Sequence, residues 1–279
     1  MKNEEVKPIA VRNLVKKFND LVVLDDLNFH VNKGEILVIM GGSGCGKSTL
    51  LRLLIGAMRP TSGRIEMLGT DLTRLDTEGL DALRRKIGIL FQSGALFNSL
   101  TVGENIALPL KEHTELSEDV IGIMVKMKLE MVGLRDFEHL KPSEISGGMK
   151  KRVGLARAMA LDPQIMFYDE PSAGLDPIAS AMIDELMMDL NKKTGVTSIV
   201  VTHDMGSAFK IADRMILLFR GRAVAEGTPA EIRSSGDPLV RQFINGLADG
   251  PIPLRVSVKD YAEDLLEPVL KRKEYENKI

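Results

Sequence analysis

The sequence predicts an α/β fold in which a sheet core carries an antiparallel β subdomain, an inserted α-helical subdomain and a C-terminal extension. The run ILVIM at 36–40 is apolar on both faces, as a strand at the centre of a parallel sheet requires. The glycine-rich stretch GGSGCGKST at 41–49 follows it and opens into an apolar-patterned helix. The segment 93–160 is rich in helix formers and methionine and has few β-branched runs.

Composition excludes several classes of protein. The chain has 279 residues, 44% hydrophobic and 27% charged, with a formal net charge of −2, so nothing favours nucleic acid as a partner. The sole cysteine, Cys45, excludes an internal disulfide and a multi-cysteine zinc site, and it makes the cytosol the default compartment. The longest apolar runs, at 36–40 and 215–219, are far below the roughly 20 residues that span a bilayer. We therefore expect that the chain does not enter a membrane by itself.

The N-terminal half predicts a β subdomain followed by the start of the core. The stretches 9–18 and 22–31 have the alternating or β-rich pattern of antiparallel strands. The buried strand at 36–40 leads through the glycine loop into a helix at 47–58. A second apolar strand is expected around 87–91, before the chain enters the helical segment.

Within the helical subdomain, 120–134 has the pattern of an amphipathic helix. The core then resumes with a strand that ends in two acids, a helix stopped by Gly195, a buried strand and a hairpin, at 164–171, 180–195, 197–204 and 215–227. From about 236 the chain reads as irregular and then as a charged tail. We therefore predict a main domain at 6–235, with the helical subdomain at about 93–160, and an extension at 236–279.

The glycine loop carries the strongest chemical signal. It matches G-x-x-x-x-G-K-[ST] between a buried strand and a helix, so its backbone N–H groups can surround phosphate oxygens at a helix N-terminus. Lys47 should reach the β- and γ-phosphates, and Ser48 should ligate Mg²⁺. The residues expected around ATP in this loop are Gly41, Gly42, Ser43, Gly44, Cys45, Gly46, Lys47, Ser48 and Thr49.

An acid pair ends the strand IMFYDE. Downstream of a phosphate loop, Asp169 suits a Mg²⁺ carboxylate, and Glu170 could polarise the water that attacks the γ-phosphate. Gln92 follows another strand and could ligate Mg²⁺ or hold that water, and otherwise is a solvated loop residue. His203 ends a third strand and could bond the γ-phosphate, although a lone histidine is more often structural.

Phe18 lies before the first buried strand and is open to two interpretations. Its ring could stack on adenine, or it could belong to the core. Cys45 is also open, because a thiol near a helix N-terminus favours the thiolate and could serve redox control, whereas a tolerated small side chain is the simpler interpretation.

A second loop, SEISGGMKKR at 143–152, has the same phosphate-binding character. One ATP has one triphosphate, which the first loop already surrounds. Two chains arranged head to tail about a two-fold axis would let Ser146, Gly147 and Gly148 cap the γ-phosphate of the ATP that the partner's Lys47 holds. Ser146 is also expected to cap the helix that runs to about residue 160, and both roles are compatible.

The order GGSGCGKST, Gln92, ISGGMK, IMFYDE, SAGLD at 172–176 and His203 resembles the nucleotide-binding subunit of ABC transporters. The resemblance implies a RecA-like P-loop NTPase core that works as a pair with Mg²⁺ and ATP. It also implies that Phe18 stacks on adenine, that Gln92 contacts Mg²⁺ and communicates with the membrane subunit, and that Asp176 lies at the dimer interface. Met149 and Ile145 depart from the family signature LSGGQ, which puts in doubt an amide contact to the opposing ribose.

The resemblance also assigns the chemistry, since Glu170 and His203 match the catalytic glutamate and the switch histidine of the family. Together with Gln92, these are the expected catalytic residues. Ser48, Gln92 and Asp169 are the expected Mg²⁺ ligands, and the opposite ATP is expected to meet Ser146, Gly147, Gly148, Met149 and Asp176.

Four further stretches resemble the ATPases of the Mla phospholipid-transport, or organic-solvent-resistance, family: QSGALF at 92–97, LPLKEHTEL at 108–116, SGGMKKR at 146–152 and FINGLADGPIP at 243–253. A SGGM signature is usual there. The resemblance implies a permease dimer, a small STAS-like cytoplasmic subunit and an MCE-type lipid-binding protein as partners, at the cytoplasmic face of the bacterial inner membrane. It implies glycerophospholipid as cargo and outer-membrane lipid asymmetry as the purpose.

Rival classes lack their own signals. A DNA-repair ABC ATPase needs long coiled coils, a translation type usually carries two cassettes, and a kinase or GTPase does not need ISGGMK. A cassette for amino acids or lipoproteins remains the alternative within transporters. The extension is apolar yet too short for its own core, so we expect it to dock on the neighbouring ATPase or an accessory subunit, or else on its own domain.

Overall fold

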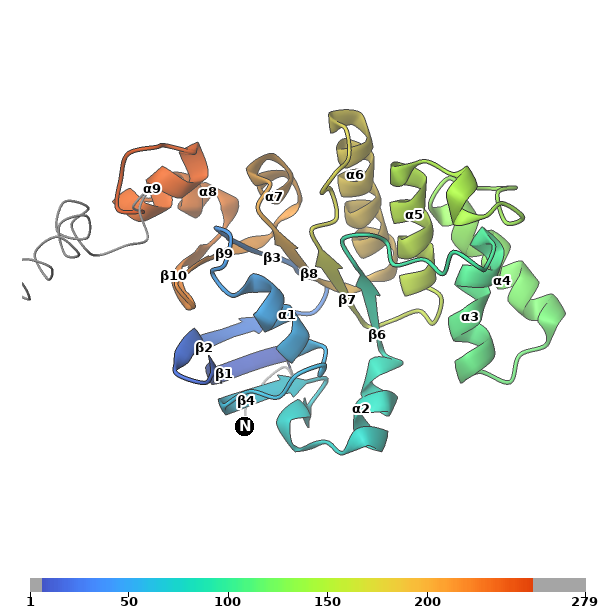
Figure 1. Ribbon diagram of the computed structural model, residues 1–279, viewed down its shortest axis with the longest axis horizontal. Coiled ribbons are helices and arrows are strands. Elements are labelled where there is room, and N and C mark those ends of the chain that lie inside the picture. The colour runs from blue at the N-terminus through green and yellow to red at the C-terminus, as the bar shows by residue number, and fades with distance from the viewer. Residues whose placement is uncertain (1–6, 253–279) are drawn as a thin grey trace, which may run out of the picture. The chain divides into compact units, whose positions relative to one another are not determined.

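The computed structural model describes residues 7–252 (Figure 1). The chain divides into two compact units, Met1–Ser234 and Ser235–Ile279. Most of the charged tail, at 253–279, lies outside the described residues.

The first unit begins with an antiparallel sheet. Within residues 7–252 its strand order is β2-β1-β4-β5. Its strands are β1 (Ile9–Phe18), β2 (Leu21–Val31), β4 (Ser62–Met67) and β5 (Thr70–Asp71). β1 pairs antiparallel with both β2 and β4, and it buries Ile9, Val11 and Leu14 while it exposes its other face. The predicted antiparallel pair is confirmed, and β4 is an addition that the sequence pattern did not indicate.

The second sheet forms the core of the unit. In the described chain its strand order is β10-β9-β3-β8-β7-β6, and β9, β3, β8, β7 and β6 run parallel. The strands are β3 (Ile36–Gly41), β6 (Ile87–Leu90), β7 (Ile165–Asp169), β8 (Thr197–Thr202), β9 (Arg214–Phe219) and β10 (Arg222–Gly227). β3 and β8 are buried along their whole length, as expected for a parallel sheet covered on both faces.

The main apolar core lies between the two sheets. The helix α1 (Lys47–Leu54) contacts β2 of the first sheet and β3, β7 and β8 of the second (Figure 1). Leu50, Leu51, Leu53 and Leu54 of α1 join buried side chains from both sheets in one cluster. Apolar burial contributes about 25 cal/mol per Å² of surface removed from water, so this cluster stabilises the packing of α1 between the sheets. Because α1 follows the glycine loop directly, its packing also positions that loop.

Helices cover the other face of the second sheet. Figure 1 shows α5 (Gly147–Ala158), α6 (Pro177–Thr194) and α7 (Met205–Ile211) on the side away from α1. Two further helices, α3 (Val102–His113) and α4 (Glu118–Met131), pack on each other and on α5, and they lie between β6 and β7 in the sequence. α6 ends at Gly195 in the left-handed conformation, with φ of 67°, as the sequence predicted.

Short elements complete the first unit. They are α2 (Thr77–Arg84), α8 (Pro229–Arg233) and two 3₁₀ turns, η1 (Leu72–Arg74) and η2 (Pro142–Glu144). Among residues 7–252, no helix has the length and the apolar character that crossing a membrane requires.

The second unit corrects one prediction. The stretch from 236 was expected to be irregular, but it contains the helix α9 (Pro238–Asn245). The side chain of Asp237 accepts hydrogen bonds from the N–H groups of Leu239 and Val240, and Gly246 ends the helix with a positive φ of 61°. An N-cap aspartate, a proline at the first helical position and a closing glycine therefore outweighed the apparent irregularity of the segment.

Candidate functional site

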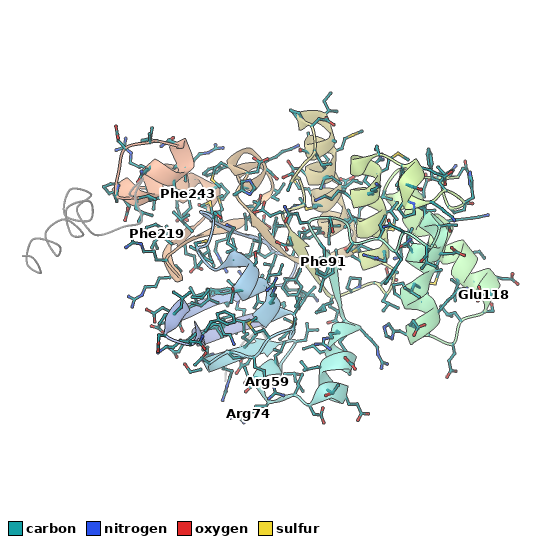
Figure 2. All side chains as sticks on the ribbon, viewed as in Figure 1. Arg59, Arg74, Phe91, Glu118, Phe219 and Phe243 are labelled. Carbon is teal, nitrogen blue, oxygen red and sulfur yellow. The ribbon has the colours of Figure 1, made fainter. Side chains whose placement is uncertain are left out.

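The expected site residues lie at the carboxyl ends of neighbouring strands. In the order β3-β8-β7-β6, the chain after β3 forms the glycine loop, β8 leads to His203, β7 ends at Asp169 and β6 leads to Gln92. All four strands are parallel, so these ends share one edge of the sheet. Figure 2 shows Phe91, the residue before Gln92, at that end of β6. Open α/β sheets bind ligands at this edge.

The glycines of the loop divide into two kinds. A Cβ on Gly41 would lie 2.4 Å from the carbonyl O of Leu218, and a Cβ on Gly46 would lie 2.6 Å from Cδ2 of Leu24. These two glycines therefore permit close packing of the loop. A Cβ on Gly42 or Gly44 would have no heavy atom within 4 Å. These two positions border open space, which leaves the backbone accessible to a phosphate.

Lys47 lies beneath the loop and is 9% exposed. Its Nζ donates to the carbonyl O of Gly41 at 2.6 Å and to that of Gly42 at 3.0 Å. The loop thus already holds an ammonium group among its own carbonyls, at the N-terminus of α1, where the helix dipole attracts anions. Ser43, Gly44 and Ser48 are exposed beside it.

The burial of Cys45 favours the simpler of its two interpretations. Its side chain is 7% exposed and belongs to the apolar cluster between the sheets. Burial raises the pKa of the Cys45 thiol, and the nearby Lys47 only partly offsets that effect. Desolvation therefore outweighs the helix N-terminus, and a small apolar packing role fits this residue better than redox control.

Glu170 has an unusual backbone and a fully engaged carboxylate. Its φ is 47°, in the left-handed region that non-glycine residues seldom adopt. Its N–H donates to the carbonyl O of Val201 at 2.8 Å. Its Oε1 lies 2.8 Å from Nδ1 of His203, and its Oε2 accepts from Oγ1 of Thr202 at 3.2 Å and from the N–H of His203 at 3.3 Å. Strain of this kind gathers at functional sites.

The structure therefore brings Glu170 and His203 into direct contact across β7 and β8. The His203 side chain is 67% exposed, whereas that of Glu170 is 14% exposed. An exposed imidazole next to a shielded carboxylate can meet a ligand from solvent while it orients the carboxylate. The expected proximity of these two residues to the glycine loop follows from β8 lying between β3 and β7.

Asp169 precedes Glu170 at the end of β7. Burial raises the pKa of its carboxyl group, and the negative charge of Glu170 raises it further, while Arg52, Lys151 and Lys47 act in the opposite direction. A cation beside this carboxylate would offset the cost of its burial, so the residue fits a Mg²⁺ ligand. In the described ranges no group of three or more His, Cys, Asp or Glu could hold a metal ion. One carboxylate with Ser48 and phosphate oxygens is the usual way in which Mg²⁺ is bound with a nucleotide.

Gln92 and Phe18 are both exposed. Gln92 lies in the turn after β6. Phe18 ends β1 with 43% exposure, which excludes the core interpretation, and Nζ of Lys16 lies 5.0 Å from its ring centroid. An exposed ring near a cation remains available for stacking on a planar base.

The second loop forms the start of α5. Ser146 is its N-cap, and its Oγ accepts from the N–H of Met149 at 3.3 Å. In Figure 1, α6 and β7 lie between α1 and α5, so the two loops begin different helices in different parts of the unit. Asp176 caps α6 and is exposed. Gly148 lies against α6, since a Cβ on it would be 3.5 Å from that of Ala179.

Sequence reasoning missed one residue at this site. Lys151 of α5 is 4% exposed, and its Nζ donates to the carbonyl O of Glu170 at 3.1 Å. In the sequence it belongs to the basic run KKR, which suggests a solvated face. Its spacing of four residues from Gly147 was the available signal, because residues i and i+4 share one face of a helix.

The fold and this strand edge define a P-loop nucleoside triphosphatase. A family model described as ABC transporter matches residues 24–173, and the chain belongs to that family. The "Intermembrane phospholipid transport system ATP-binding protein MlaF" of Haemophilus influenzae is 45% identical over 259 residues, which are 93% of this chain and 98% of that protein. The protein of the same name from Escherichia coli K12 is 44% identical over 244 residues, or 88% of this chain and 91% of that one.

Other similar proteins carry different names. The "Probable ribonucleotide transport ATP-binding protein mkl" of Mycobacterium leprae is also 44% identical over 88% of this chain, which matches 70% of its own length. Among solved structures, a dimeric post-hydrolysis ATP-binding cassette bound to ADP and Pi superposes with a TM-score of 0.73 at 34% identity, over 79% of this chain and 98% of that one. The cbiO1 cassette of Clostridium perfringens gives a TM-score of 0.77 at 30% identity, over 85% and 95% of the two chains.

Proposed function

We propose that the chain is the ATP-hydrolysing subunit of a bacterial phospholipid transporter. Two copies sandwich two ATP molecules at the cytoplasmic face of the inner membrane and drive phospholipid transport between the inner and outer membranes, which maintains outer-membrane lipid asymmetry. Its partners are a permease dimer, a small STAS-like subunit and an MCE-type lipid-binding protein. The observation that carries the hydrolytic part is the contact of Glu170 with His203, one strand away from the glycine loop.

Binding of the nucleotide follows from the loop. Backbone N–H groups of 41–49 and Nζ of Lys47 donate to the phosphates, and the exposed Phe18 offers a face for the adenine. Ser48, Asp169 and Gln92 would hold Mg²⁺, which neutralises phosphate charge when it is bound. Gly42 and Gly44 keep the approach to the loop free of side chains.

Hydrolysis requires a base for the attacking water. The Glu170 carboxylate is shielded and held by Thr202 and His203, so it can orient a water molecule and accept its proton. His203, which is more exposed, bonds the γ-phosphate and detects its loss. Positioned base catalysis of this kind contributes about 10²–10⁴-fold to a rate.

The second copy completes each site. Ser146 has its N–H-rich helix end exposed, and the first turn of α5 has two glycines, so this end can donate to the γ-phosphate of the opposite ATP. Asp176 at the start of α6 lies at the same interface. The dimeric cassette bound to ADP and Pi supports a pair of chains as the working unit.

The cargo rests on the named relatives. Two of them are phospholipid-transport ATPases that this chain covers almost completely, whereas the equally identical mycobacterial protein is named for ribonucleotides and is longer. Affinity purification from detergent-solubilised membranes separates the cases. Recovery of an MCE-type protein supports phospholipid transport, and recovery of no membrane protein contradicts a role in any transporter.

The hydrolytic mechanism is tested with Glu170→Gln. The amide keeps the shape of the side chain but cannot accept the proton, so ATPase activity of the complex should fall at least 100-fold while ATP still binds and a closed dimer accumulates. Glu118→Gln is the control, because that carboxylate is exposed on α4 and pairs with Lys111. A Glu170→Gln variant that stays monomeric with saturating Mg-ATP would contradict the sandwich.

A further inference from the structure

Lys151 occupies an unusual position for a lysine. It lies in the second turn of α5, four residues after Gly147 and three after Gly148, so these three positions share one face of the helix. That face packs toward α6 and the turn that precedes it, since a Cβ on Gly148 would contact Ala179. The Lys151 side chain is therefore enclosed, with 4% exposure.

The enclosed ammonium group has one hydrogen-bond acceptor among the described residues, the carbonyl O of Glu170, at 3.1 Å. No carboxylate lies within 4.0 Å of it there. Burial lowers the pKa of Lys151, and the charges of Asp169 and Glu170 oppose that effect. Burying an ammonium group that has a single hydrogen-bond acceptor costs free energy. This cost indicates that the bond to Glu170 has a function.

Lys151 bonds the backbone of Glu170, which is strained. The left-handed conformation of Glu170 is unfavourable for a residue with a Cβ, and hydrogen bonds hold it from both sides. The N–H of Glu170 bonds Val201, and its carbonyl O accepts from both Lys151 and the N–H of Ala173. Without Lys151, one of these restraints is lost.

We propose that Lys151 is a positioning residue for hydrolysis, which fixes the backbone of Glu170 so that the carboxylate is aimed at the attacking water. This inference rests on the proposed role of Glu170. It places the helix that begins at Ser146 in direct contact with the catalytic turn of the same chain. In this role Lys151 acts through the backbone of Glu170 and not on the nucleotide or the water.

The test uses Lys151→Met in the complete transporter complex. Methionine keeps the length and apolar stem and removes the donor. We expect kcat for ATP hydrolysis to fall about tenfold or more with little change in the KM for ATP. Lys151→Arg, which restores a charged donor, should recover part of the loss. Lys128→Met is the matched control, because Lys128 is a buried lysine on α4 that bonds Asp162 instead.

A second readout separates positioning from support of the helix. In the Glu170→Gln background, Lys151→Met should still form the closed dimer with Mg-ATP, because the loop at Ser146 is intact. Loss of that dimer, an equal loss of kcat in Lys128→Met, or unchanged kcat in Lys151→Met would overturn the inference. Should Lys151→Met fail to fold, Lys151→Leu, which also lacks a donor, serves in its place. Failure of Glu170→Gln alone to dimerise would instead contradict the proposed function.

Discussion

Single residues of the glycine loop separate the needs of folding from those of ligand binding. Gly41 has no room for a Cβ because the carbonyl O of Leu218 and Sγ of Cys45 lie 2.4 Å and 2.6 Å from where it would be. A Cβ on Gly42, one residue later, would have no heavy atom within 4 Å. The two glycines belong to one motif, but Gly41 is required by packing and Gly42 leaves space for a ligand.

Alanine substitutions should reveal this difference. Gly41→Ala forces the backbone of β9 to shift and should lower the free energy of unfolding by about 1–3 kcal/mol, as overpacking does. Gly42→Ala should leave it within about 0.5 kcal/mol of the wild type. Chemical denaturation measures both. Equal destabilisation by the two changes would show that the loop is not packed as described.

The place of the motif residues at strand ends could be predicted from the sequence, but the burial of individual side chains could not. The spacing of Gly41, Lys47 and the acid pair places them at strand ends, because a buried strand followed by a loop has few arrangements. The burial of Cys45 and Lys151 depends on how α1 and α5 pack on distant strands. The helix N-terminus left the state of Cys45 open, and the basic run gave no sign that Lys151 is buried, so tertiary packing decides both.

At the scale of elements, α6 and α7 are joined by a buried polar contact. Oγ of Ser207 on α7 donates to Oδ1 of Asp184 on α6 at 2.5 Å, and both residues are at most 5% exposed. Burial raises the pKa of Asp184, and Ser207 and Lys210 only partly oppose this. α7 begins two residues after His203, with Asp204 as its N-cap, so this contact holds the helix that follows the His203 turn.

The pH dependence of this contact has a definite sign. A raised pKa in the folded state means that the folded protein binds the proton more tightly, so the contribution of Asp184 to stability is present at low pH. It is lost as pH rises from the ordinary carboxyl range through the raised pKa. Asp184→Asn, which cannot ionise, should therefore gain stability relative to the wild type between pH 4 and pH 8.

Denaturation midpoints at the two pH values measure that gain. Ser207→Ala is the contrasting variant, because it removes the donor and leaves the buried carboxylate without it, at a cost of about 1–3 kcal/mol. A difference between Asp184→Asn and wild type that is the same at pH 4 and pH 8 would show that Asp184 does not titrate differently on folding.

Most elements of the core could be predicted because their apolar periodicity is strong. β4 was missed because its sequence, SGRIEM, is half exposed and has little apolar signal, and its pairing with β1 is a long-range contact. α9 was missed although Asp237 and Pro238 form a helix start, because the glycines and prolines around it suggested a loop.

At the scale of the molecule, we propose that each copy supplies half of two sites. The loop at 41–49 and the loop at Ser146 begin different helices, α1 and α5, and one chain cannot bring both to the same phosphate in the proposed arrangement. The presence of two phosphate-binding loops in the sequence leads to the same arrangement, which stays a prediction. Which surfaces meet the membrane subunits depends on the partners and has no local pattern.

The C-terminal extension gives a whole-molecule prediction. Ser235–Ile279 form a unit of their own, and we expect them to dock on the neighbouring copy or an accessory subunit. Truncation after Gly236 should weaken recovery of the complex in affinity purification while ATP binding by the remaining domain persists. Unchanged dimerisation together with unchanged accessory binding would contradict this prediction.

The bond from Lys151 to Glu170 has a consequence for timing. In the proposed dimer, the N-terminus of α5 would lie at the ATP of one site, while Lys151 of the same helix bonds the backbone of Glu170, the proposed base of the other site. In such a dimer, each of the two α5 helices would connect one nucleotide site to the other. Binding of ATP at one site would then affect the position of the proposed base at the other, so hydrolysis at the two sites would be coupled without direct contact between the two glutamates.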